Sequence, residues 1–254
     1  MIFGRVLYNN VIRGLTTAFS GTTLTGKPPA SATDWADYSF FSADSGNLDY
    51  TVAVDTAIDS VAIYVQTIAG TNSIVLQYES SASTFTTLKT FSAPSGTLDY
   101  EEFTSVTVAA GRKIRFIITA ATVLNIRQLV VGPKLVFPIG QWATVTPSSF
   151  LQGVKVTNNI GQNGSILGRS LKRLERSGKI DLDYLTDAFV RASWEPFALH
   201  AARYPFLFVW DYSGHADDIA FAYSTKIEAP SHASAGFLSA SMPIKFLVAD
   251  SLAI

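Results

Sequence analysis

Residues 177–214 read SGKIDLDYLTDAFVRASWEPFALHAARYPFLFVWDYSG, and this stretch decides how the second half of the chain folds. Most of the sequence before it consists of short runs rich in Ser, Thr and β-branched residues, which are typical of strands. Here apolar and aromatic residues instead recur at helical spacing and then run directly into an aromatic strand. The pattern predicts one helix over about 183–203, packed on a β-sheet.

The ends and the apolar face of this helix follow from a few residues. Asp183 or Thr186 is suited to cap its first turn. Pro196 is expected to kink or split the helix, and Pro205 to stop it before FLFVW (206–210). Leu185, Phe189 and Ala192 recur at spacings of four and three and so form one apolar face. We expect this face, together with Phe197, to pack on the sheet.

From Tyr50 to Gly132, strand-like runs alternate with turn-forming residues. The runs are YTVAVD, SVAIYVQTIAG, SIVLQYES, FTSVTVAAG, KIRFIIT and LNIRQLVVG. Gly, with Pro or Asn in two of the three turns, separates them in GTN (70–72), PSG (94–96) and AAG (109–111). Strands that recur about every 8–12 residues favour an antiparallel β-sandwich.

Residues 14–49 have weak periodicity and many turn-forming residues, so we expect them to wrap the sandwich as loops. Aromatic residues gather within this segment at Trp35, Tyr38 and Phe40. Aromatic rings pack well against the C–H faces of sugars, which makes these three residues candidates for glycan contact. The alternative is a hydrophobic loop that covers the sandwich.

The charged residues are few and unevenly distributed. They make up 15% of the 254 residues, against about 25% in an average globular protein, and the net charge is −1. The net charge is −8 over residues 14–102, +10 over 103–180 and −5 over 181–254. Two interpretations of the basic segment stay open. In the first, its charges pair with acidic residues of the same fold. In the second, they form a basic face, either in an assembly or toward a passing nucleic acid. In an assembly this would be an inter-subunit or lumen-facing surface that includes Arg169, Lys172, Arg173 and Arg176.

No motif for catalysis or for metal binding is found. The chain has no Cys, which excludes disulfides, thiolate zinc sites and Cys nucleophiles. GQNGSILGRS (161–170) departs from a phosphate-binding loop, because Asn163 replaces its first Gly and Arg169 its Lys. In HADD (215–218), neighbouring residues on a strand would point to opposite faces. We therefore expect no enzyme activity, no cofactor and no metal.

No apolar run approaches the roughly 18 residues that a membrane-spanning helix needs. The start MIFGRVLYNNVIRGL also lacks the layout of a secretory signal. We therefore expect a protein made in the cytoplasm and not inserted into a membrane.

The second half resembles a family of viral proteins. NGSILGRS is followed by a basic strand, then by GKIDLDYLTDAFVRASWEPFALHAARYPFLFVWD, DIAFAYST and EAPSHASAGFLSASMPIKFLV. Over about residues 140–250 this order resembles the distal-tail-like proteins of long-tailed bacteriophages, most specifically in DAFVRASWEPFALHA followed by PFLFVWD. In the first half, RKIRFIITAATVLNIRQLVVG (112–132) resembles the last strands of discoidin-like, galactose-binding jelly rolls.

The resemblance implies a structural virion protein of the phage tail tip or baseplate. Such a protein would form a homo-oligomeric ring, hexameric by family resemblance, in contact with tail tube, tape measure and hub proteins. The family's belt-like β domain makes the ring, and a carbohydrate-module-like domain decorates it. The alternative function is a carbohydrate-binding, host-recognition module of a phage tail that binds a cell-surface glycan.

The expected fold is mainly β, with two β-sandwich-like domains and one helix on the sheet of the second. In this chain the decorating domain precedes most of the belt domain, unlike the usual order in the family. Residues 1–13 are expected to supply the first strand of the belt domain, with the jelly roll inserted after it. The jelly roll then spans 14–135, and the belt-like domain continues over 136–254.

Overall fold

The computed structural model contains two compact units, one inserted into the other in sequence. Unit 1 comprises Met1–Val6 and Leu135–Ile254, and unit 2 comprises Leu7–Lys134. The boundaries predicted from the sequence lie after residues 13 and 135. The structure describes residues 4–34, 40–66, 72–92, 98–121, 123–138, 154–160, 162, 166–174, 177–234 and 236–246. For residues 154–160, 166–174, 215–217 and 233–234 it describes the backbone only.

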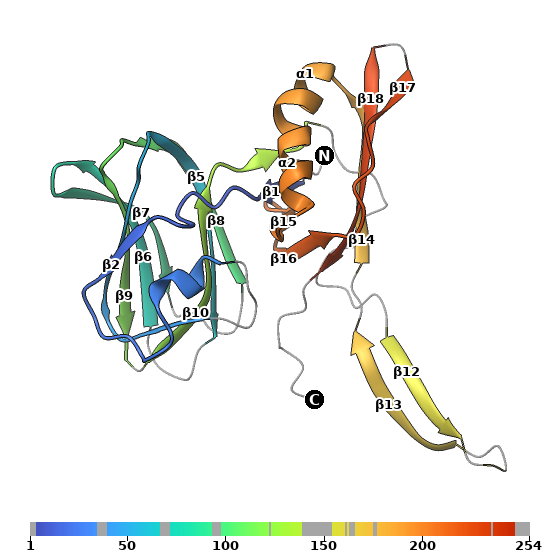
Figure 1. The fold of residues 1–254 in the computed structure, drawn as a ribbon, viewed down its shortest axis with the longest axis horizontal. Helices are drawn as coiled ribbons and strands as arrows, with labels where there is room; N and C mark the ends of the chain where they lie inside the picture. The colour runs from blue at the N-terminus through green and yellow to red at the C-terminus, as the bar shows by residue number, and fades with distance from the viewer. Residues whose placement is uncertain are drawn as a thin grey trace. The chain divides into compact units, whose positions relative to one another are not determined.

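Unit 2 is a β-sandwich of two antiparallel sheets (Figure 1). The first sheet has five strands, in the order β2 (Thr16–Phe19), β4 (Gly46–Thr51), β9 (Lys113–Ala120), β6 (Asn72–Ser81) and β7 (Thr84–Ser92). The second has four, in the order β3 (Phe41–Ala43), β10 (Leu124–Gly132), β5 (Thr56–Gln66) and β8 (Leu98–Val108). A 3-10 helix, η1 (Pro29–Ala32), lies between β2 and β3 in sequence.

The alternation of residues along these strands builds the core of unit 2. In β9, Ile114, Phe116 and Ile118 are buried, whereas the residues between them are partly exposed. Such alternation is expected of a strand with one face toward a core. The buried residues of both sheets form one hydrophobic cluster, and all of its fully buried members lie between Ile12 and Val131.

The predicted turns and loops of unit 2 are confirmed in one place and wrong in another. Gly111 has φ = 78°, as the AAG turn requires, and its N–H donates to the Val52 carbonyl at 2.8 Å. Residues 14–49, however, are not only loops, because they contain β2, η1, β3 and the first part of β4. Their strands are only three to six residues long, too short for periodicity to reveal.

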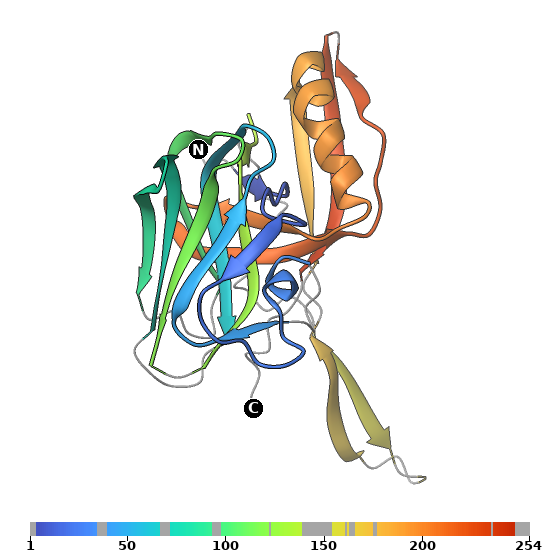
Figure 2. The same ribbon diagram turned by 60° about the vertical axis from the view of Figure 1, so that its left-hand side comes forward.

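Unit 1 contains a seven-stranded sheet with a helix beside it (Figure 2). The strand order is β11 (Leu135–Val136), β1 (Arg5–Leu7), β15 (Phe206–Asp211), β16 (His215–Ser224), β18 (Phe237–Phe246) and β14 (Ser177–Leu185), and β17 (Ser231–Ser234) also pairs with β18. β1 pairs with β11, with Val6 opposite Leu135. The chain therefore leaves unit 1 for unit 2, and returns to it, through two adjacent strands.

Two further strands of unit 1 form a separate hairpin. β12 (Val154–Ile160) and β13 (Ile166–Leu174) pair with each other in a two-stranded antiparallel sheet. Among the described residues neither strand pairs with a third. The register sets Val154 opposite Leu174 and Lys155 opposite Arg173.

The helix spans residues 187–201 rather than the predicted 183–203. It consists of α1 (Asp187–Phe189), a π-helical turn η2 (Val190–Trp194) and α2 (Glu195–Ala201). Thr186 is the N-cap, and its Oγ1 accepts a hydrogen bond from the Phe189 N–H at 3.2 Å. Asp183 instead lies in β14, which continues to Leu185 through a bulge where Tyr184 has φ = 58°.

The face of the helix that is buried differs from the predicted one. Ala192 is exposed and Phe189 is only half-buried, whereas Leu185 is buried as predicted but lies at the end of β14. The buried residues start one position later and recur at spacings of four, three and four: Val190, Trp194, Phe197 and Ala201. Phe197, as predicted, is buried, and its ring packs edge-on against Phe206 of β15 with the centroids 4.9 Å apart.

The break at Pro196 has a physical cause. Pro196 has no N–H to donate to the carbonyl four residues before it, and its ring would clash with that carbonyl. The turn before it widens, and the Glu195 N–H bonds to the Val190 carbonyl, five residues back. The predicted kink or split thus takes the form of a π turn.

Candidate functional site

A polar row crosses four strands of the five-stranded sheet in unit 2. The register sets Asp49 of β4 opposite Arg115 of β9, and Arg115 opposite Gln77 of β6. Gln77 in turn lies opposite Thr87 of β7. The neighbours of Arg115 along β9, Ile114 and Phe116, point into the core, so the row lies on the outer face of the sheet. We call this row, together with Lys113 and Phe85, the Arg115 face.

Asp49 and two cations form the centre of this face. Arg115 donates from Nε to Asp49 Oδ1 at 2.6 Å and from Nη2 to Oδ2 at 2.8 Å, which is a bidentate pair. Lys113 Nζ donates to the same Oδ2 at 3.2 Å. One carboxylate therefore serves two cations.

Phe85 and Gln77 lie next to Arg115 on the strands β7 and β6. The Arg115 guanidinium lies 3.6 Å from the centroid of the Phe85 ring, close enough for a cation–π contact. Gln77 Nε2 donates to Thr87 Oγ1 at 3.0 Å. The bidentate pair and the aromatic contact fix the orientation of Arg115 and leave its remaining N–H groups in a defined place.

The electrostatics agree with this geometry. Burial alone would raise the pKa of Asp49, but hydrogen bonds from Arg115 and Lys113 outweigh burial and hold that pKa below its usual range. The hydrogen bond to Asp49 raises the pKa of Arg115. The backbone N–H of Ser83, with Arg112 nearby, lowers the pKa of Glu79. The shifts of both pKa values favour the ionised forms of Asp49 and Arg115 at neutral pH.

The basic segment of unit 2 is largely paired within the fold. Arg112 contacts Glu79 at 3.5 Å, and Lys134 contacts Glu102 at 2.7 Å. Together with the Asp49 pairs, these contacts favour the first of the two interpretations for residues 103–134. Arg127 donates to Gln66 Oε1 at 2.8 and 3.0 Å.

The structure describes the predicted glycan residues only in part. Trp35 and Tyr38 lie outside the described residues. Phe40 is half-buried, and Lys27 Nζ lies 3.9 Å from the centroid of its ring. Glycan contact by these three residues stays a prediction.

Three of the four residues of the predicted basic surface belong to the hairpin β12–β13. Arg169, Lys172 and Arg173 lie in β13, where only the backbone is described, and Arg176 lies outside the described residues. Arg169 pairs with Asn158 of β12. A role for these residues in an inter-subunit or lumen-facing surface also stays a prediction.

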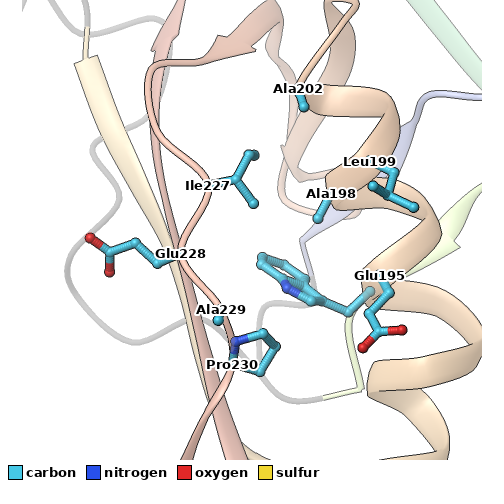
Figure 3. Close-up of a pocket in the computed structure, with 9 residues that line it drawn as sticks. Glu195, Ala198, Leu199, Ala202, Ile227, Glu228, Ala229 and Pro230 are labelled. Carbon is cyan, nitrogen blue, oxygen red and sulfur yellow. The ribbon is translucent and has the colours of Figure 1, made fainter.

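Unit 1 contains an apolar groove of about 470 Å³ between α2 and the segment 227–230 (Figure 3). Ile227 points toward the helix, whereas the carboxylate of Glu228 points away from it. Ala198 and Ala202 are small, and Leu199 is 68% exposed at the margin. Glu195 and Glu228 are the charged residues of the lining, and they do not converge. The groove is suited to apolar contact rather than to chemistry.

Other candidates for chemistry do not assemble in the described part of the chain. Asp218 is buried in β16, while the side chains of His215 and Asp217 are not described. Among the residues whose side chains are described, no group of three His, Asp or Glu has metal-binding geometry. Within the described ranges, no helix has both the length and the apolar character to cross a membrane.

Sequence reasoning missed the Arg115 face. The alternation in LDYT (48–51) and KIRFIIT (113–119) does put Asp49 and Arg115 at outward positions. The two residues, however, are 66 positions apart, and a single sequence does not reveal that β4 pairs with β9.

Comparison with known proteins finds similarity at the level of solved structures. No protein-family model matches the chain, and no curated protein matches it. The chain is similar to chitosan-binding module 1 of a chitosanase/glucanase from Paenibacillus sp. IK-5, at 16% identity and a TM-score of 0.41, over 49% of this chain and 99% of that one.

Two further structures give similar values. CBM32-1 from a family 31 glycoside hydrolase of Clostridium perfringens has 16% identity and a TM-score of 0.40, over 50% of this chain and 99% of that one. A putative alpha-L-fucosidase from Bacteroides thetaiotaomicron has 13% identity and a TM-score of 0.42, over 50% of this chain and 29% of that one. All three resemble about half of this chain.

Proposed function

We propose that unit 2 is a non-catalytic carbohydrate-binding module and that the Arg115 face contacts the sugar. The observation that carries this proposal is the ordered centre formed by Asp49, Arg115 and Phe85. Planar polar groups with fixed orientation suit the paired hydroxyls of a sugar ring, and an adjacent aromatic residue suits its C–H surface. The fixed side chains lose little entropy on binding.

The polar groups of the face offer both donors and acceptors. Arg115 has five N–H groups and donates two of them to Asp49, so three remain without a protein partner among the described residues. Two hydrogens of Lys113 Nζ are likewise unused within that part of the structure. A sugar hydroxyl can accept from these groups and donate to Gln77 Oε1.

A glycan array probed with the full chain tests the proposal, followed by calorimetric titration of the strongest binder. We expect binding in the weak range typical of a small open site, and at least a tenfold loss with Phe85→Ala combined with Gln77→Ala. The matched control is Thr107→Ala, which removes an exposed side chain from β8 in the other sheet of the sandwich. Retention of full affinity by the double variant, or the lack of any bound glycan, would refute the proposal.

A second candidate function is a ring-forming structural subunit of a phage tail tip, located in the virion. Two observations favour it. The sandwich interrupts unit 1 between the paired strands β1 and β11, which suits a decorating domain on an assembling one. The hairpin β12–β13 has no other strand partner among the described residues, and its sequence is strongly basic.

Arg169→Glu with Arg173→Glu tests this second candidate. We expect the double variant to remain folded but to assemble less than wild type in light scattering across a protein and salt series, because exposed charges are screened over about 8 Å at physiological ionic strength. Arg203→Glu with Lys226→Glu is the control of equal charge change outside the hairpin. A wild-type chain that stays monomeric at all concentrations and is absent from purified virions would exclude the ring.

A further inference from the structure

We infer that the Arg115 face selects acidic saccharides, those whose sugar units carry carboxylates. This inference rests on the carbohydrate-binding function proposed above and names the class of its ligand. The starting observation is a charge imbalance at the centre of the face, where Arg115 and Lys113 share the single carboxylate of Asp49. The three groups together carry one net positive charge at neutral pH.

The imbalance is directed outward. The Asp49 side chain is 10% exposed, whereas Arg115 is 20% and Lys113 40% exposed. The neighbouring pair repeats this arrangement, because Glu79 is 11% and Arg112 34% exposed. At both positions the carboxylate lies inside and the cation lies outside. A ligand that approaches the sheet therefore meets the cations first.

The unused donors have the geometry that a carboxylate requires. Asp49 occupies Nε and one Nη2 hydrogen of Arg115, and the end of the guanidinium keeps one hydrogen on Nη1 and one on Nη2 parallel to each other and in the same plane. A guanidinium edge matches the two oxygens of a carboxylate, and Lys113 Nζ adds a point charge beside it. A neutral hydroxyl can accept from the same donors, but it does not neutralise the net positive charge of Arg115, Lys113 and Asp49, whereas a carboxylate does.

The stability of the fold alone does not require two cations beside Asp49. One cation is enough to satisfy Asp49, and Arg115 already does so with two hydrogen bonds. Lys113 contributes a third contact to the same oxygen, at the longer distance of 3.2 Å. Its removal therefore leaves Asp49 paired, which makes Lys113 the residue that separates ligand binding from stability.

The experiment compares polygalacturonate, alginate and hyaluronan with the methyl ester of each polymer, using the full chain in affinity electrophoresis and calorimetry. The ester keeps the backbone and removes the charge. We expect at least one acidic polymer to bind about tenfold more tightly than its ester at low salt. The preference should shrink near 1 M salt, where screening acts within about 3 Å.

Lys113→Gln should lower affinity for the acidic polymer about fivefold, the effect of one exposed charge. It should lower affinity for the ester clearly less, because the Gln amide can still donate a hydrogen bond to a sugar hydroxyl. Lys113→Glu should abolish the preference. Lys226→Gln, the same charge change in unit 1, is the control and should have no effect. Urea denaturation of Lys113→Gln should show near wild-type stability, so that a change in binding is not a folding defect.

Three other outcomes are decisive in different ways. If acids and esters bind equally and Lys113→Gln has no effect, the selectivity for acidic sugars is wrong while the glycan-binding function stands. If Lys113→Gln and Lys226→Gln weaken binding equally, the attraction is non-specific and the site is wrong. If no polymer and no array glycan binds, the proposed function fails together with the inference.

Discussion

At the scale of single residues, Asp49 links the stability of unit 2 to pH. Its folded-state pKa lies below its usual value, so its ionised form is stabilised by folding. That contribution is complete above the unfolded-state pKa of about 3.9 and is lost as the pH falls through the lower folded-state value. The residue therefore favours the folded state at neutral pH and ceases to do so in acid.

Asp49→Asn tests this linkage. We expect the variant to lose about 1–3 kcal/mol of unfolding free energy at pH 7, the range for a hydrogen-bonded charged group, and the difference from wild type to shrink as the pH falls below about 4. Urea denaturation across a pH series measures both. Asp187→Asn, in an exposed pair with Arg191, should stay within about 0.5 kcal/mol of wild type. A difference independent of pH would contradict the assignment.

At the scale of elements, the helix 187–201 is held to its sheet by Phe197. This side chain is fully buried and contacts the rings of Trp194 at 5.6 Å and Phe206 at 4.9 Å. Phe197→Ala should cost about 3–5 kcal/mol, as expected for a large aromatic residue removed from a core. Phe189→Ala, at a half-buried position, should cost clearly less. Thermal or urea unfolding of the two variants measures the contrast, and equal losses would refute the buried face described here.

The helix also shows what a single sequence can and cannot predict. Its existence, its cap at Thr186 and the break at Pro196 follow from local chemistry and are confirmed. The buried face is predicted only in part: Phe197 is buried on the helix as expected, and Leu185 is buried at the end of β14, whereas Phe189 is half-buried and Ala192 is exposed. Val190 and Trp194, in a second apolar series that starts one residue later, are buried in their place, and the large Trp194 ring packs against Phe197 in the core.

The Arg115 face could likewise be predicted only in part from the sequence. Strand alternation places Asp49 and Arg115 outward, so their exposure to the solvent side could be predicted. Which outward residues become neighbours depends on strand order and register, and these are set by contacts between distant parts of the chain. Trp35, Tyr38 and Phe40 can be recognised as a cluster from the sequence because they lie close together along the chain, whereas the residues of the row come from four separate strands.

At the scale of the whole molecule, unit 2 carries a complete core of its own. The fully buried members of its hydrophobic cluster all lie between Ile12 and Val131. Residues 7–134 expressed alone should therefore unfold in one cooperative transition, as measured by calorimetry and circular dichroism. A fragment that binds hydrophobic dye and shows no transition would contradict the division.

The pairing of β1 with β11 has a further consequence for how the sandwich is tethered. Two backbone crossings, at residues 6–7 and 134–135, connect it to the other unit, and Val6 lies opposite Leu135 where they meet. A single protease nick at one crossing therefore leaves the sandwich attached through the other, and release takes two cuts. The two ends of the sandwich segment are also held next to each other by the β1–β11 pair. We therefore expect that another domain whose own termini are adjacent could replace residues 7–134 and leave the strand order of unit 1 unchanged.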